Sequence, residues 1–187
     1  MHSFYFHRTD CNLYIFRSLQ LSNTVDSGQK ILDRFILRIF VDADAVPSAV
    51  REIIFRAAER TGMNVILVAN IPLKIPESVY ISGVVVSLSP DAADDYIASE
   101  VSAGDLVVTS DIPLAARAVE KKSFVIDFRG NLITDRNINE RLALRNLMDD
   151  LRQAGENTDR QSSFSQRDRR NFANQLDQFL SKYVRII

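Results

Sequence analysis

Five short apolar runs constrain the fold of this chain more than any other feature of its sequence. The runs are LRIFVD at 37–42, NVILVA at 64–69, GVVVS at 83–87, DLVVTS at 105–110 and FVIDF at 124–128. Near-continuous apolar runs of this length are typical of strands buried on both faces of a sheet. Because most of them are separated by segments with helical spacing, we expect βαβ units and a mainly parallel sheet, which is an α/β fold.

The segments between the runs carry signals of helix ends. Pro47 stands where a first helical turn tolerates proline, and the apolar residues after it repeat at helical spacing up to a capping glycine, Gly62. Residues 70–82 contain two prolines and predict a loop. The next helix is expected to begin at a capping Asp91 and to end at Gly104. Further helices are predicted over 112–122, 137–155 and 165–184.

Composition and charge narrow the class of protein. The chain has 187 residues, of which 46% are hydrophobic, and this suits one compact domain. A formal net charge of −1 gives no global attraction to nucleic acid or to anionic membranes. The single cysteine excludes an internal disulfide, and no apolar run approaches the roughly 20 residues that span a bilayer. We therefore expect a soluble, cytoplasmic protein with no membrane partner, whose oligomeric state stays open.

The pattern divides the chain into three parts. Residues 1–36 have no clear period and make a poor signal peptide, because charged residues and a histidine interrupt their apolar positions. They are interpreted either as a mobile extension or as an artefact of the choice of start site. Residues 37–155 are expected to form the α/β domain. Residues 156–187 are expected to form a polar linker and an amphipathic helix that packs on this domain. The apolar stripe of that helix comprises Phe172, Leu176, Phe179 and Leu180.

Three separate segments bring acidic residues to the edge where the parallel strands end. They are Asp42 and Asp44 after the first run, Asp91, Asp94 and Asp95 before or within a first helical turn, and Asp111 after the fourth run. Ligands bind at this edge of open parallel sheets. Carboxylates that lie close together raise one another's pKa unless a cation is present. Because these motifs contain no Cys or His, the cation expected is Mg²⁺ or Mn²⁺.

Each acid also has an interpretation that needs no ligand. Asp44, Asp91 and Asp111 all stand where a side chain can cap a helix, and the helix dipole favours acids in a first turn. Asp42 is harder to explain in this way, because an acid at the end of a buried strand needs a partner. The occurrence of all these acids at strand ends is what favours a functional site.

Six motifs follow one another from Phe40 to Leu180: FVDADAVP, DAADDYI, GDLVVTSDIPLA, FRGNLIT, NINERLALRNLMDDLR and FSQRDRRNFANQLDQFL. Together they resemble the YaiI/YqxD family of uncharacterised bacterial proteins. The family usually has a cysteine in the first motif, where this chain has Val46, which argues against a chemical requirement for that cysteine. The long N-terminal extension is not a normal feature of the family.

The resemblance groups the chain with PIN-like domains, and it implies a three-layer α/β/α sandwich and a nuclease-like site. Carried over to this sequence, the metal ligands are Asp42, Asp94, Asp95 and Asp111, and Asp44 is added from its spacing as a residue that orients water or a second ion. The leading hypothesis is thus a Mg²⁺- or Mn²⁺-dependent phosphodiesterase that acts on RNA or another nucleic acid. Candidate substrate-binding residues are Asn70, Thr109, Ser110, Arg117 and Arg129.

Two alternatives stay open. FVDADA also resembles the strand and DxD start of haloacid-dehalogenase-like phosphatases, in which Asp42 would be the nucleophile and Asp44 the acid/base. That superfamily's lysine and closing acidic pair are not found in the expected order. The other alternative is a non-catalytic domain that binds RNA or a protein.

Overall fold

A computed structural model describes residues 37–155 and 163–183 of the chain. The expectations for residues 1–36, and for most of the polar linker, lie outside the described residues. Within the described ranges, no helix is both long enough and apolar enough to cross a bilayer.

The core of the described chain is one six-stranded sheet. Its strands are β1 (Arg38–Asp42), β2 (Asn64–Ala69), β3 (Ile81–Val85), β4 (Leu106–Val108), β5 (Phe124–Ile126) and β6 (Leu132–Ile133). They lie in the order β3-β2-β1-β4-β5-β6, and only the β5–β6 pair is antiparallel. The mainly parallel sheet predicted from the apolar runs is therefore confirmed.

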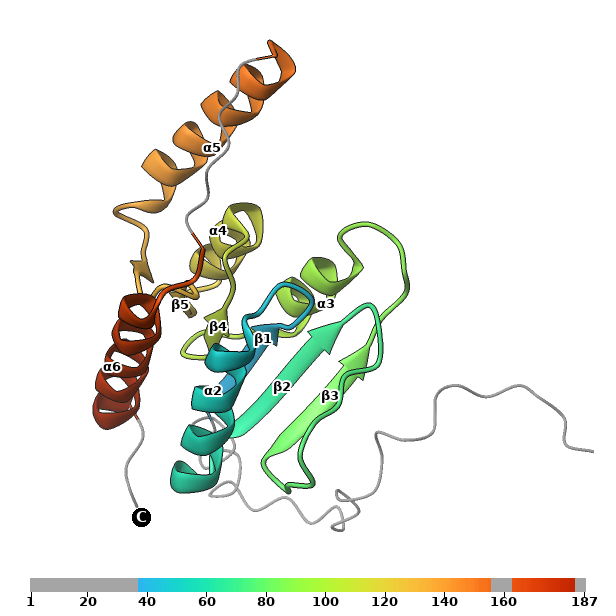
Figure 1. The fold of residues 1–187 in the computed structure, drawn as a ribbon, viewed down its shortest axis with the longest axis vertical. Helices are drawn as coiled ribbons and strands as arrows, with labels where there is room; N and C mark the ends of the chain where they lie inside the picture. The colour runs from blue at the N-terminus through green and yellow to red at the C-terminus, as the bar shows by residue number, and fades with distance from the viewer. Residues whose placement is uncertain (1–36, 156–162, 184–187) are drawn as a thin grey trace, which may run out of the picture. The chain divides into compact units, whose positions relative to one another are not determined.

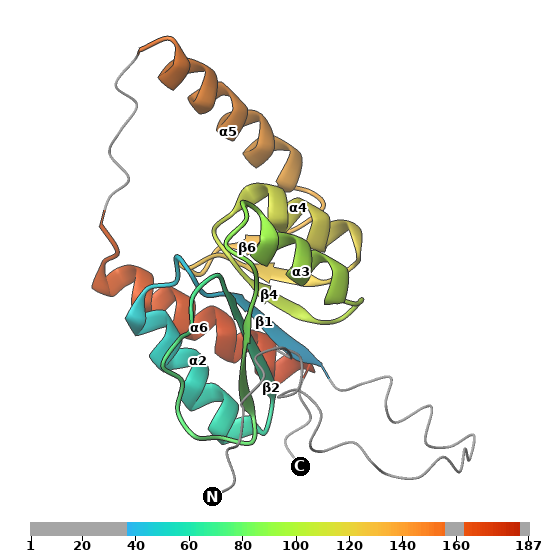
Figure 2. The ribbon, with the colours of Figure 1, turned by 90° about the vertical axis from the view of Figure 1, so that its right-hand side faces the viewer.

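Helices cover both faces of this sheet (Figures 1 and 2). On one face α2 (Ser48–Thr61) and α6 (Gln166–Tyr183) contact each other and share a core with Ile39 and Val41 of β1. On the other face α3 (Ala92–Glu100) and α4 (Ile112–Glu120) pack around Phe40. Successive residues of a strand point to opposite faces, so β1 contributes to both cores. The arrangement confirms the three-layer α/β/α sandwich.

The long helix α5 (Ile138–Gln153) is less embedded than the others. It contacts α4, and Ile138 in its first turn is buried, whereas Leu144 and Leu147 are exposed. Both ribbon views show its far end leaving the sheet (Figures 1 and 2).

The strand order places a topological switch point beside β1. From β1 the chain moves outward through β2 to β3, and it then crosses to the other side of β1 to form β4. Crevices that bind ligands in open α/β sheets lie at the carboxyl ends of strands where the order reverses in this way. Asp42 ends β1, and Thr109 to Asp111 follow β4 directly.

The structure differs from the predictions for the third strand, for the helix after Asp91 and for the segment after β5. The third strand lies at Ile81–Val85 rather than at 83–87, because Ile81 and Ser82 pair with β2. The helix after Asp91 ends at Glu100 instead of Gly104, because Val101 is extended and buried. The short β6 was not expected; a turn with its glycine at φ +83°, Gly130, brings this strand back beside β5.

Candidate functional site

Asp42 and Thr109 form the centre of the site at the switch point. The Thr109 hydroxyl donates a hydrogen bond to Oδ2 of Asp42 over 2.9 Å, and its oxygen accepts one from the Asp111 N–H over 3.0 Å. Thr109 is fully buried, so its single hydroxyl proton is committed to Asp42. Thr109 therefore orients the carboxylates that end β1 and follow β4, and this geometry does not support a direct contact with substrate.

Asp111 caps α4. Its Oδ1 accepts a hydrogen bond from the Leu114 N–H over 2.8 Å, which is the geometry of an N-cap residue. The capping interpretation of Asp111 is thus confirmed, and capping does not remove its charge from the site. The Asp111 carboxylate stands at the positive end of the α4 dipole, beside the end of β1.

Asp94, from the first turn of α3, completes a group of three interacting carboxyl groups. Burial is the largest cause of a pKa of about 6 at Asp94; the charges of Asp111, Asp42 and Asp91 add to the rise, and Arg117 opposes it by a smaller amount. Burial is also the largest cause of the raised pKa of Asp42, which the Thr109 hydrogen bond partly offsets. We call Asp42, Asp94 and Asp111 the acidic site.

Asn70 connects the loops that surround the acidic site. Its backbone N–H donates to both carboxylate oxygens of Asp44, over 3.1 and 3.0 Å. Its side-chain Nδ2 donates to the carbonyl oxygens of Ser87 and Ser89, over 2.9 and 3.4 Å. Asn70 therefore links the ends of β1, β2 and β3, and it helps to position the segment that leads into α3 and Asp94.

Asp95 and Asp91 lie differently from Asp94. The Asp95 carboxylate is exposed and forms an ion pair with Arg117 over 2.8 Å, so the structure does not bring it into the acidic site. Asp91 precedes α3 in a left-handed conformation and makes no side-chain capping bond, contrary to the predicted cap. Its backbone carbonyl accepts the Asp95 N–H instead, over 2.7 Å.

Ser110 and Arg129 contact neighbouring parts of the fold. Ser110 is exposed, and its oxygen accepts a hydrogen bond from the Phe128 N–H over 3.4 Å, which leaves the hydroxyl proton to donate. The Arg129 guanidinium donates to the carboxylate of Asp168 on α6 over 3.2 Å. Arg117 and Arg129 are thus both ion-paired with acids of this chain.

Two further buried acids stabilise local structure. Asp105 accepts hydrogen bonds from the backbone and guanidinium of Arg38, at the edge of the sheet opposite to the acidic site. Asp127 closes the turn before β6, where it accepts from the Arg129 and Asn131 N–H groups.

The donor set of the acidic site suits a hard divalent cation, because it consists of carboxylate oxygens alone. In the arrangement of the described residues, however, no group of three or more His, Cys, Asp or Glu side chains is positioned to hold a metal ion.

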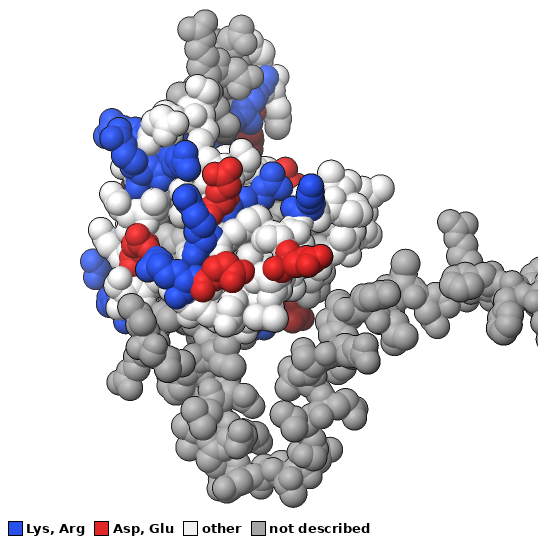
Figure 3. Space-filling model, turned by 60° about the horizontal axis from the view of Figure 1, so that its bottom comes forward, with Lys and Arg blue, Asp and Glu red and all other residues white. Residues whose placement is uncertain are grey.

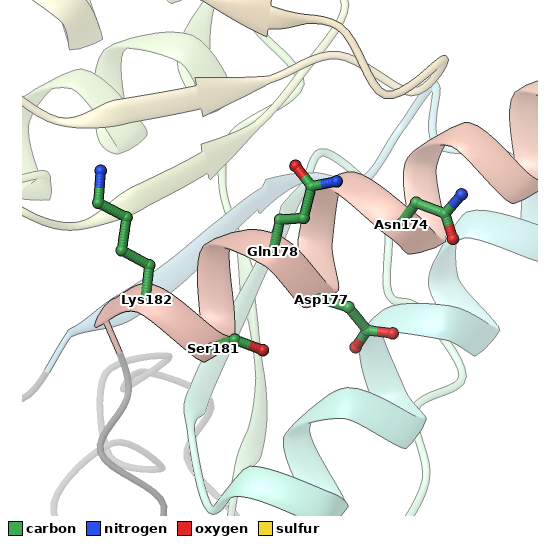
Figure 4. A pocket seen from close by; sticks show the side chains of 5 residues that line it. All are labelled: Asn174, Asp177, Gln178, Ser181 and Lys182. Atoms are coloured by element: carbon green, nitrogen blue, oxygen red, sulfur yellow. The ribbon is translucent and has the colours of Figure 1, made fainter.

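Two other surface features lie outside the acidic site. A shallow hollow is lined, among the described residues, by side chains of a single helix, α6: Asn174, Asp177, Gln178, Ser181 and Lys182 (Figure 4). On the face drawn in Figure 3, acidic and basic side chains of the described residues are interspersed.

The comparisons with known proteins agree with the motifs. The family model described as "Uncharacterized BCR, YaiI/YqxD family" matches residues 40–182. The UPF0178 protein of Syntrophotalea carbinolica is 48% identical over 148 residues, which cover 79% of this chain and all of the relative. The UPF0178 protein of Dechloromonas aromatica is 51% identical over 78% of this chain and 97% of its own length. No solved structure matches the chain. By these matches the chain belongs to the YaiI/YqxD family.

Proposed function

We propose that this chain is a Mg²⁺- or Mn²⁺-dependent phosphodiesterase that acts on nucleic acid at the acidic site. The observation that carries the proposal is the convergence of Asp42, Asp94 and Asp111 from three segments at the topological switch point, and the raised pKa of Asp94 supports it. A protein that keeps several carboxyl groups close together and partly buried loses stability unless the group binds a proton or a cation. The preference for RNA rests on the resemblance to PIN-like domains alone.

Each residue near the site has a role in this proposal. A divalent ion would supply Lewis-acid chemistry to a phosphate and to the attacking water. Asp42, Asp94 and Asp111 would hold the ion through their carboxylate oxygens. The buried Thr109 hydroxyl fixes the orientation of Asp42. Asn70 holds Asp44 at the rim, and the exposed Ser110 hydroxyl is free to donate to a phosphate oxygen.

The aspartyl-phosphate mechanism finds less support. It needs Asp44 to move protons at the reacting group, whereas both carboxylate oxygens of Asp44 accept from the Asn70 N–H. Detection of a phosphorylated Asp42 after incubation with a phosphate monoester would favour that mechanism over the phosphodiesterase.

Substitutions within the acidic site and beside it test the proposal. We expect Asp42→Asn and Asp94→Asn to weaken Mn²⁺ binding by at least tenfold, about 1.4 kcal/mol, because each removes one charged ligand. Asp95→Asn is the matched control: it removes a neighbouring carboxylate that is paired with Arg117, and it is expected to leave Mn²⁺ binding within about twofold. Calorimetric titration measures binding, and cleavage of a labelled single-stranded RNA measures activity.

Clear results would contradict the assignment. Metal-dependent cleavage that is unchanged in Asp42→Asn would remove Asp42 from the site. If Asp94→Asn and Asp95→Asn weakened Mn²⁺ binding equally, the proposal that Asp94 is a ligand and Asp95 is not would be wrong. Tight binding of RNA without any binding of Mn²⁺ at millimolar concentration would favour the non-catalytic alternative.

A further inference from the structure

Exposed apolar side chains gather beside the acidic site. Among the described residues eight large hydrophobic side chains are exposed, and two of them stand just after the carboxyl ends of β2 and β3: Ile71 at 58% and Leu88 at 78%. Single exposed apolar residues are normal on protein surfaces, so the pairing of these two beside the acidic site rather than their exposure needs an explanation. We call Ile71 and Leu88 the apolar shelf.

The hydrogen bonds of Asn70 hold the apolar shelf next to the acidic residues. Ile71 follows Asn70 directly, and Leu88 lies between the two serines whose carbonyl oxygens accept from the Asn70 side chain. The Asn70 N–H donates to Asp44, whose charge acts on Asp42. The shelf is thus connected to the acidic site through one residue and its direct hydrogen bonds.

The chemistry of the shelf fits a nucleobase. A phosphodiester bound at the acidic site carries a nucleoside on either side, and apolar side chains pack against the flat faces of bases that are removed from a stack. Bases within a duplex have their faces covered by neighbouring pairs, and binding of a duplex depends on Lys and Arg contacts to phosphates. The shelf contains no charged side chain, and the nearby Arg117 is paired with Asp95.

We propose that Ile71 and Leu88 contact the base of an unpaired nucleotide whose phosphate lies at the acidic site, so that the protein selects single strands over duplexes. This proposal rests on the proposed function, because the acidic site determines where the phosphate lies. Ile71 and Leu88 are then residues that determine specificity, and they do not take part in the chemistry.

The test combines substitutions of the shelf with removal of bases from the ligand. Ile71→Ser and Leu88→Ser are compared with Val79→Ser, which changes an 88% exposed side chain near the opposite, amino end of β3. Fluorescence anisotropy at low ionic strength with Mn²⁺ measures binding of three probes: a short single-stranded RNA, a sugar-phosphate chain of equal length without bases, and a duplex. Calorimetry measures Mn²⁺ binding by each variant.

We expect Leu88→Ser to weaken binding of the single strand about fivefold to tenfold, at the low end of measured base-stacking effects, and to leave binding of the base-free chain within about twofold. Val79→Ser is expected to change neither. Any of four results would overturn the proposal. They are equal losses of affinity for the single strand and the base-free chain, equal losses in Val79→Ser, duplex binding as tight as single-strand binding, and no binding of any strand. Failure of the wild-type protein to bind Mn²⁺ would overturn the proposed function instead, while the strand comparison would still decide whether the shelf contacts bases.

Discussion

Ionisation of Asp94 opposes folding. Its pKa in the folded protein is about 6, against an ordinary value of 3.8. Between these values the folded state binds more protons than the unfolded state, so stability falls as pH rises through this window. The stabilisation that proton binding at Asp94 gives is therefore complete below about pH 4 and is lost above about pH 6. Above this window, the ion-free protein carries an ionised carboxylate that its environment disfavours.

Asp94→Asn is consequently expected to stabilise the ion-free protein at pH 7.5, because it removes a charge that burial and neighbouring acids disfavour. The expected gain is on the order of 1 kcal/mol once solvent screening is considered, which raises Tm by about 2–4 °C. Thermal unfolding in the presence of a chelator measures it, and the gain should disappear near pH 4. A Tm lowered at pH 7.5, or raised equally by Asp95→Asn, would contradict this account of Asp94.

The sequence alone did not separate Asp94 from Asp95. Both stand in the first turn of a helix, and one step along a helix turns a side chain by about 100°. Which of the two faces the end of β1 depends on where α3 begins, and Asp91 begins it in an unexpected left-handed conformation. Asp42 and Asp111 were predictable, since they directly follow buried runs of the sheet. The sequence predicted that Thr109 contacts substrate, whereas the structure buries its side chain fully. This burial depends on tertiary packing, so no local sequence signal could have predicted it.

At the scale of elements, the turn between β5 and β6 fixes the position of α6. A Cβ on Gly130 would lie 2.5 Å from the backbone carbon of Asn171, so α6 approaches this turn as closely as a glycine allows. The backbone N–H and hydroxyl of Ser165 donate to Asp168 and hold the pKa of this carboxyl below its usual range, with a smaller contribution from Arg129. Asp168 thus joins the start of α6 to the same turn.

Two glycines with the same backbone angle allow this contact to be tested. Gly130 and Gly155 have φ values of +83° and +84°, but among the described residues no atom beyond the chain neighbours lies within 4 Å of a Cβ at Gly155. Gly155→Ala is expected to lower the free energy of unfolding by about 1 kcal/mol through backbone strain alone. Gly130→Ala should lower it by about 2 kcal/mol more, because the methyl group meets the backbone of α6. Denaturant unfolding measures both, and equal losses would exclude a tight approach of α6.

The elements that could be predicted are those with a strong local pattern. Strong local patterns predicted β1 and β2 from their apolar runs and α2 from its helical spacing up to Gly62. Gly62 does end this helix, with φ +69°. The exact start of β3 and the end of α3 were missed, because they depend on register with β2 and on how the chain enters β4. The two-residue β6 exists only through its pairing with β5, which no short window of sequence encodes.

At the scale of the whole molecule, the strand order brings distant acids to one place. Asp42 and Asp111 are separated by three strands and two helices in the sequence, yet β1 and β4 are neighbours in the sheet. Alternating strands and helices predicted a parallel sheet, and its carboxyl edge predicted a meeting of acids there. The order of the strands, which makes the end of β1 a switch point, came only with the structure.

Competition between protons and a divalent ion should therefore make the stability of the whole fold depend on pH and metal together. An ion bound only by the folded state stabilises it, by about 2.7 kcal/mol when its free concentration is 100 times Kd. We expect Mn²⁺ to raise Tm by several degrees at pH 7.5, and by much less at pH 5, where the pKa of Asp94, raised to about 6, favours a bound proton over the ion. Thermal scans with Mn²⁺ and with a chelator at both pH values measure the difference.

Asp42→Asn is the control, in which the Mn²⁺ effect should vanish. A rise in Tm that is equal at both pH values, or that persists in Asp42→Asn, would mean that the ion binds somewhere other than these carboxylates.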